Sequence, residues 1–181
     1  MRKDKIAQFV CFETTLGTEQ FIKRWEQYSR SVNSDVDVTL QRSDKNGAFR
    51  YIAQHRCAPG ELQFVFTKEG RSSRTPQIEI KAKQAGGYTI LQSERMNDTH
   101  ADESKVFVFL ANSQNDLDVY KQLSAHSKLN IYEAYYENCQ YAYILEYFVK
   151  NKYVAKLLEQ LKQYDAAEVG MYKECALQIT V

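Results

Sequence analysis

Hydrophobic positions in the first part of the chain follow two periods, one typical of strands and one typical of helices. Residues 6–14 predict a strand. Thr18 then predicts the N-cap of a helix, because apolar residues recur after it at helical spacing, at Phe21, Trp25, Tyr28 and Val32. A strand followed by an amphipathic helix is therefore expected at the start of the fold.

A hairpin is predicted next. Residues 36–41 alternate between apolar and polar side chains, and the turn at 43–47 ends in Asn-Gly, which favours a tight reversal. Residues 49–57 form the returning strand. Residues 62–66 fit a short helix or, at 64–66, a short strand, and their position after a hairpin favours the helix.

The middle of the chain contains one long predicted strand and one polar segment. Residues 78–91 predict the strand, with a bulge or bend at Gly86-Gly87. Residues 93–104 are polar and show no periodicity. We therefore expect two halves, residues 1–95 and 105–181, joined by a linker at 96–104.

The second half repeats the order of the first. Residues 105–111 predict a strand, and Asn115 or Asp116 then caps a helix that carries Leu117, Tyr120 and Leu123. Residues 131–149 form a tyrosine-rich hairpin with Glu137 and Asn138 near its turn. Asn151 is the predicted cap of the most regular helix, whose stripe is Tyr153, Val154, Leu157, Leu158 and Leu161, and residues 167–181 close the half as a strand.

The predicted fold class is α+β. The order β-α-β-β-α-β is the split βαβ arrangement named for ferredoxin, and it occurs twice. Neither face of the tyrosine hairpin is plainly polar, so helices must cover one face and something else must cover the other. Two ferredoxin-like halves whose antiparallel sheets pack together into an intramolecular α+β barrel would meet this requirement.

Composition and charge exclude several classes of protein. Lys and Arg (24) nearly balance Asp and Glu (23), which disfavours a nucleic-acid binder, and the basic run 68–74 is interpreted as a solvated loop. No apolar run approaches the roughly 20 residues of a membrane helix. The cysteines lack metal-site or disulfide spacing and are interpreted as reduced thiols of a cytoplasmic protein: Cys11, Cys57, Cys139 and Cys175.

The predicted arrangement resembles the dimeric α+β barrel superfamily, in which some chains carry both halves in tandem. The antibiotic-biosynthesis monooxygenase type is the branch that it resembles most. The resemblance implies a ligand between helices and sheet within a half, and an activity without a cofactor. Haem-degrading members carry an asparagine on the first strand, whereas residues 6–14 contain none and Trp25 lies on the first helix. Haem degradation is therefore not expected.

The candidate site lies in the first half. His55 is the predicted catalytic residue, a general base toward an acidic phenol or enol, because histidine titrates near neutrality. Trp25, Tyr28 and Tyr51 are the predicted substrate-binding walls. Each has a simpler interpretation: His55 as a hydrogen-bonded structural histidine, and the aromatic residues as core packing. No metal site is expected.

Two functional hypotheses remain open at this level. One is a small-molecule-binding protein, either a simple binder or a cofactor-independent monooxygenase that acts on an aromatic or enolic compound. The other is a non-catalytic regulatory or assembly module that uses the barrel as a protein-interaction scaffold. The expected partner is a small-molecule ligand. The chain is expected to be a monomer or a homodimer, and in a homodimer a second copy of the chain is also a partner.

Overall fold

The computed structural model describes residues 6–29, 37–45, 47–57, 80–95, 100–111, 117–135, 139–164 and 168–176. Features predicted from the sequence that lie outside the described residues include the short helix at 62–66, the loop at 68–74, the first part of the linker, the helix cap at Asn115 or Asp116, and the turn of the tyrosine hairpin.

Strands and helices follow the predicted order. The first half contains β1 (Ile6–Thr14), α1 (Thr18–Ser29), β2 (Asp37–Lys45), β3 (Tyr51–Cys57) and β4 (Ile80–Ser93). The second contains β5 (Glu103–Leu110), α3 (Leu117–Gln122), the short 3₁₀ helix η2 (Leu123–His126), β6 (Ser127–Ala134), β7 (Tyr143–Lys150), α4 (Asn151–Leu161) and β8 (Glu168–Glu174).

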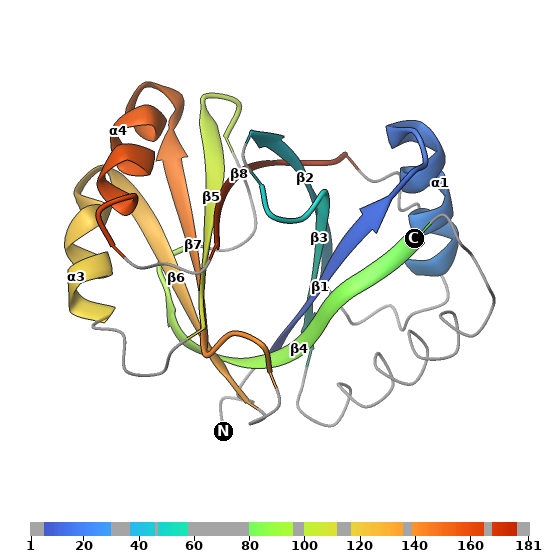
Figure 1. The fold of residues 1–181 in the computed structure, drawn as a ribbon, viewed down its shortest axis with the longest axis horizontal. Helices are drawn as coiled ribbons and strands as arrows, with labels where there is room; N and C mark the ends of the chain where they lie inside the picture. Colours follow the sequence, from blue (N-terminus) through green and yellow to red (C-terminus); the bar gives the residue numbers. More distant parts are fainter. Residues whose placement is uncertain are drawn as a thin grey trace.

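The strands close into an antiparallel barrel in the order β1-β3-β2-β8-β5-β7-β6-β4 (Figure 1). Strands β1 to β4 are neighbours along one arc, and β5 to β8 complete the other. The seams between the arcs are the β2–β8 and β4–β6 pairs. Because closure pairs every strand on both sides, no open sheet edge is left. The predicted α+β barrel is thus confirmed at the level of fold class.

Each arc is covered on both faces over most of its strands, although β4 has exposed positions. Aromatic residues dominate the barrel interior: Phe9, Tyr88, Phe107, Phe109, Tyr132, Tyr141 and Tyr172 belong to one buried cluster there. On the outside, α1 covers β1, β3 and β2 through a cluster that includes Phe12, Phe21, Trp25 and Leu40. Helices α3 and α4 cover the outer face of the second arc, over Val106, Val108, Leu145 and Tyr147 (Figure 1). The prediction of two covered faces for the tyrosine hairpin is confirmed.

Contrary to the prediction, the glycine pair on β4 does not interrupt the strand. The register of β4 against β1 runs without a shift through Gly86 and Gly87, and the irregularity lies between Cys11 and Phe12. A Cβ at Gly86 would lie 2.9 Å from the Tyr88 ring. The physical reason for this glycine is therefore close packing inside the barrel and not a bulge.

Asn151 does not cap α4. Lys150 occupies the N-cap position and makes no side-chain capping bond, and Asn151 is the first helical residue. Its Oδ1 instead accepts a hydrogen bond from the Ser104 hydroxyl at 2.7 Å. The polar side chain that suggested a cap thus ties α4 to β5.

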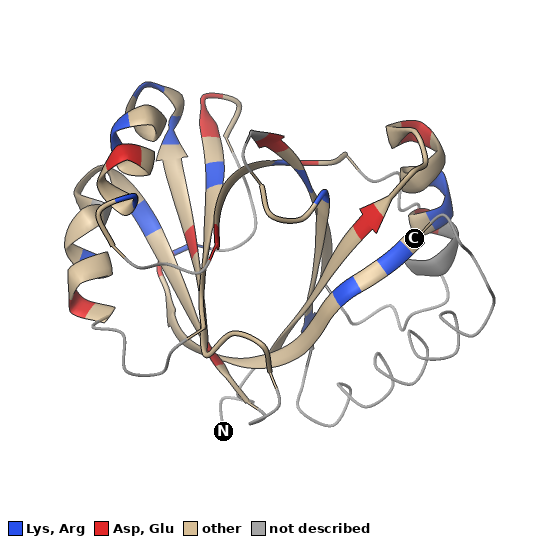
Figure 2. Cartoon of the chain, in the orientation of Figure 1, with Lys and Arg blue, Asp and Glu red and all other residues tan. Residues whose placement is uncertain are grey.

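Charged residues of both signs are interspersed over the helices and strands in the view of Figure 2. This distribution agrees with a net charge of +1. Among the described residues, no helix is both long and apolar enough to span a bilayer.

Candidate functional site

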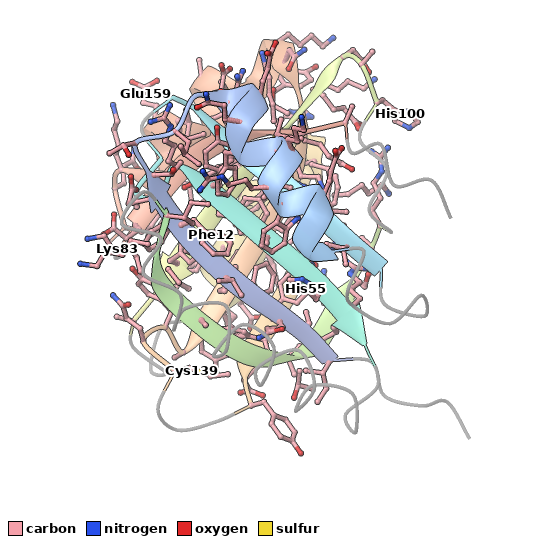
Figure 3. All side chains as sticks on the ribbon, turned by 90° about the vertical axis from the view of Figure 1, so that its right-hand side faces the viewer. Phe12, His55, Lys83, His100, Cys139 and Glu159 are labelled. Atoms are coloured by element: carbon pink, nitrogen blue, oxygen red, sulfur yellow. The ribbon has the colours of Figure 1, made fainter. Side chains whose placement is uncertain are left out.

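Strand alternation places Gln8, Phe12, Tyr51 and His55 on the outer face of the barrel, beneath α1. Gln8 and His55 are paired across β1 and β3. Figure 3 shows α1 lying over these strands, with Phe12 on β1 and His55 on β3 near the C-terminal end of the helix. The predicted site residues on this face therefore share one helix–sheet layer.

Trp25 is the contact between α1 and His55. Its ring centroid lies 5.7 Å from that of His55 and 5.3 Å from that of Phe12. Both the indole and the imidazole are buried, with exposures of 6% and 0%. Sequence analysis placed Trp25 and His55 in one site, and the helix–sheet packing brings them together.

Burial sets the protonation state of His55. Removal of the imidazole from water disfavours the charged form and lowers its pKa from 6.5 to about 4. His55 is therefore neutral near pH 7, with one ring nitrogen able to accept a hydrogen bond and the other able to donate one. A conjugate acid with so low a pKa makes this imidazole a weak base but a suitable hydrogen-bonding group.

Tyr51 and Tyr28 differ from the other predicted site residues. The Tyr51 ring stacks on Phe21 with centroids 4.1 Å apart, and its hydroxyl donates to Thr18 Oγ1 at 3.2 Å. Tyr51 thus anchors the first turn of α1, on the same face as His55 but four positions away along the strand. Tyr28 belongs to α1, but its side chain lies outside the described part of the chain.

Gln8 is a site residue that the sequence-based search missed. Its side chain is fully buried between His55 on β3 and Gly87 on β4. The signal in the sequence was a polar residue at an outer position of a strand whose other outer positions, Val10 and Phe12, are apolar. A buried amide beside a neutral imidazole gives this layer several hydrogen-bonding atoms.

At the corresponding positions of the second arc stand an apolar residue and a tyrosine. There, the strand register places Val106 of β5 opposite Tyr147 of β7, at the place that Gln8 and His55 occupy in the first arc. The Tyr147 hydroxyl donates to the carbonyl of Tyr120 in α3, 2.8 Å away. The outer layer beneath α3 and α4 is therefore closed by apolar packing and one internal bond.

A second polar group lies inside the barrel and centres on Glu146 of β7. Its Oε2 accepts a hydrogen bond from the Tyr132 hydroxyl at 2.6 Å and one from Asn130 Nδ2 at 3.1 Å. The Tyr132 hydroxyl in turn accepts from Gln54 Nε2 at 2.9 Å and from Arg56 at 2.8 Å. Burial, and next the charge of Glu146, raise the pKa of Tyr132, so its hydroxyl stays protonated.

Lysine and glutamate side chains complete this interior network. Lys105 Nζ lies 3.3 Å from Glu146 Oε1 and 3.4 Å from Glu174 Oε2. Lys105 and Glu146 are both fully buried, whereas the Glu174 side chain is 33% exposed. The sequence placed Glu146 on one face with Ile144 and Phe148, and a charge amid apolar neighbours is the signal that a buried counter-charge exists.

Metal ligation is not supported in the described part of the chain. No group of three or more His, Cys, Asp or Glu residues there could hold a metal ion. His126 is exposed and stacks on Tyr153 with ring centroids 4.5 Å apart. Cys11, Cys139 and Cys175 are free thiols, and burial raises the pKa of Cys175 to about 11.

Neither a protein-family model nor a curated protein sequence matches the chain. Solved structures of similar fold include variants of chlorite dismutase from Candidatus Nitrospira defluvii. One of these variants, in which a tryptophan is replaced, has a TM-score of 0.63 to this chain at 8% sequence identity. The alignment covers 97% of this chain and 92% of the variant. The complex of that enzyme with imidazole has a TM-score of 0.57 at 7% identity, covering 96% and 92%. At such identities the likeness establishes the fold alone, an α+β barrel.

Proposed function

We propose that this protein binds a small molecule between α1 and the outer face of β1 and β3. The observation that carries the proposal is the buried pair of Gln8 and His55 beneath Trp25, where the second arc has Val106 and Tyr147. Glutamine and histidine are uncommon among the fully buried residues of an apolar layer. A site that selects a polar group of a ligand gives such residues a function.

The ligand that fits these groups is an aromatic or enolic compound with a hydroxyl. Trp25 and Phe12 offer ring faces and edges for stacking. Neutral His55 supplies an acceptor for the ligand hydroxyl, and the Gln8 amide supplies a donor and an acceptor. A charged ligand is disfavoured, because the fully buried imidazole is uncharged near pH 7.

Catalysis is the finer part of this proposal. A monooxygenase-like reaction without a cofactor begins with removal of a proton from the bound phenol or enol, and His55 is the base for that step. Because the pKa of His55 is about 4 in the free protein, this step requires either an acidic substrate or a substrate whose binding raises the pKa of His55. Similarity of fold to chlorite dismutases agrees with an enzyme but does not select this reaction.

The alternative is a non-catalytic scaffold that binds a partner protein. Such a role needs a contiguous apolar surface. Among the described residues, the large hydrophobic side chains that are exposed are Leu91, Tyr135 and Tyr164. They lie in β4, after β6 and after α4. This distribution favours the small-molecule proposal over the scaffold.

We also propose that the barrel consists of two tandem ferredoxin-like halves, 1–95 and 105–181, joined at 96–104. Two correspondences support this. The strand order β2-β3-β1-β4 in the first arc matches β6-β7-β5-β8 in the second. In addition, Phe9 lies opposite the first residue of segment 86–88, and Phe107 lies opposite the first residue of segment 170–172. Both segments have the sequence Gly-x-Tyr.

Trp25 provides the test of ligand binding, because it is the only tryptophan in the chain. Its fluorescence is excited where tyrosine does not absorb, and a panel of phenols, quinols and enolic diketones is titrated. A saturable change in the wild type is expected, with an affinity at least about tenfold weaker in His55→Phe, since a hydrogen bond is lost. Tyr147→Phe, at the corresponding position of the second arc, is the matched control and keeps the wild-type affinity.

The catalytic part has a separate test. If the tightest ligand is turned over, His55→Ala lowers the turnover number by roughly a hundredfold or more. An unchanged rate with weakened binding would remove the base but leave the binding site.

A further inference from the structure

The barrel interior has a polar end whose hydrogen bonds are incomplete. Alternation places Thr39 and Gln41 of β2 and Gln54 of β3 on the inner face, where Thr39 lies opposite Gln54 and Gln41 lies opposite Glu174 of β8. Lys105, from the other arc, reaches Glu174 at 3.4 Å. Residues far apart in the sequence thus meet at one end of the barrel.

Several buried polar atoms at this end have no hydrogen-bond partner among the residues that the structure describes. Both amide atoms of Gln41, the Oε1 of Gln54 and the Oγ1 of Thr39 are in this state. Gln41 and Gln54 are fully buried. Buried amide groups are satisfied in nearly all native proteins, and each one without a partner is destabilising. No described residue bonds to these atoms, which leaves them available to a bound molecule.

The unpaired atoms indicate the chemistry of the missing partner. Acceptor atoms predominate, namely Gln41 Oε1 and Gln54 Oε1, and Thr39 Oγ1 can accept as well. The charges of this end already face each other, since Lys105 lies between Glu146 and Glu174. A partner with several O–H donors, at least one acceptor for Gln41 Nε2, and no net charge therefore fits best.

We propose that this end of the barrel interior is a binding site for a small polyol. The polyol hydroxyls donate to the Gln41 and Gln54 carbonyl oxygens and accept from Gln41 Nε2. Glu174, which is partly exposed, marks the side on which the cluster reaches the surface. An eight-stranded barrel either fills its interior with side chains or holds one small ligand. This site lies on the opposite face of β3 from His55 and does not depend on the function proposed above.

The test uses side-chain amide signals in ¹⁵N-labelled protein. Glycerol and erythritol are titrated, with 1,2-dimethoxyethane as a probe of similar size that accepts hydrogen bonds but donates none. The signals of Gln41 and Gln54 are assigned from the variants Gln41→Leu and Gln54→Leu. Exposed Gln163 is the internal control, and the Trp25 indole signal reports on the layer beneath α1.

The proposal expects saturable shifts of the Gln41 and Gln54 amides with a polyol, none with the ether, and none at Gln163 or Trp25. In Gln41→Leu, the polyol concentration that half-saturates the Gln54 shift should be at least about tenfold higher, because one hydrogen bond to the polyol is lost. Shifts that stay linear, or that the ether reproduces, would mean that only water occupies this end and would overturn the proposal.

Thermal unfolding provides a second readout for the same variant. Gln41→Leu removes amide atoms that have no partner, so its midpoint without polyol should equal or exceed that of the wild type. Added polyol should raise the wild-type midpoint by more than that of the variant. A variant midpoint well below the wild type would show that the protein itself satisfies Gln41, which contradicts the site.

Discussion

Replacement of Glu146 by leucine tests the interior network most severely. The side chain is fully buried, accepts hydrogen bonds from Tyr132 and Asn130, and lies 3.3 Å from Lys105. In Glu146→Leu, Glu174 is the remaining carboxylate of this network near the Lys105 ammonium. The Tyr132 hydroxyl also loses its charged hydrogen-bond acceptor. We therefore expect a large loss of stability.

The magnitude follows from the kind of interaction that is lost. Removal of one partner from a buried ion pair costs about 3–5 kcal/mol, because the other charge stays buried. For a domain of this size, each kcal/mol lowers the thermal midpoint by about 2–4 °C, so the expected decrease is roughly 6–20 °C. Since total stabilities are about 5–15 kcal/mol, the variant should still fold at low temperature.

The assay is urea unfolding followed by Trp25 fluorescence, with calorimetry for the midpoint. Lys105→Met alone should also destabilise, and the double variant with Glu146→Leu should lose less than the sum of the single losses. Lys121→Met, in an exposed pair with Asp118, is the control and should leave the midpoint unchanged. A loss below about 1 kcal/mol for Glu146→Leu, or strictly additive single losses, would refute the reasoning.

Two further predictions concern His55 and Gly170. Because burial lowers the pKa of His55 from 6.5 to about 4, the unfolded chain binds a proton first as the pH falls. The contribution of His55 to the free energy of unfolding should therefore be complete above pH 6.5 and should decrease by about 3 kcal/mol as the pH falls toward 4. His55→Gln should remove this decrease from the pH profile of stability. Identical profiles for the variant and the wild type would contradict the burial of His55. Gly170→Ala would place a Cβ 2.5 Å from the Gly47 Cα, so a loss of about 1–3 kcal/mol is expected. Gly17→Ala, where a Cβ meets nothing within 4 Å, is the control in the same thermal scan.

The order of elements could be predicted because it depends on local patterns. The apolar run of β1 and the helical spacing of Phe21 and Trp25 can be read from residues close together in the sequence. Each arc also pairs strands that are close together in the sequence. The two semi-apolar faces of the tyrosine hairpin likewise required two covers, which helices and the barrel interior supply. Closure of the barrel followed from that requirement.

Contacts between the arcs could not be predicted in the same way. Arg56 and Glu146 lie in different halves, and alternation gives the face of each side chain but not the partner across the barrel. Asn151 has the residue type of a cap, yet its bond to Ser104 depends on where β5 lies against α4. Such pairings depend on register across the whole barrel, which no local pattern contains.

The candidate site was predictable in part. His55 and Tyr51 share a face because they lie an even number of residues apart on one strand. Trp25 belongs to the apolar stripe of α1. The low pKa of His55 could not be foreseen, because it arises from burial beneath the helix. Gln8 was missed because a single glutamine in an apolar strand has no motif around it.

The most direct test of the proposed site is ¹⁵N NMR of the His55 imidazole at pH 7, recorded while the tightest phenol or enol from the fluorescence panel is added. We expect a neutral imidazole in the free protein and a saturable shift of its acceptor nitrogen that follows the Trp25 fluorescence change. An imidazolium signal in the free protein, or an imidazole that does not respond while the ligand binds, would contradict the assignment of this layer as the binding site.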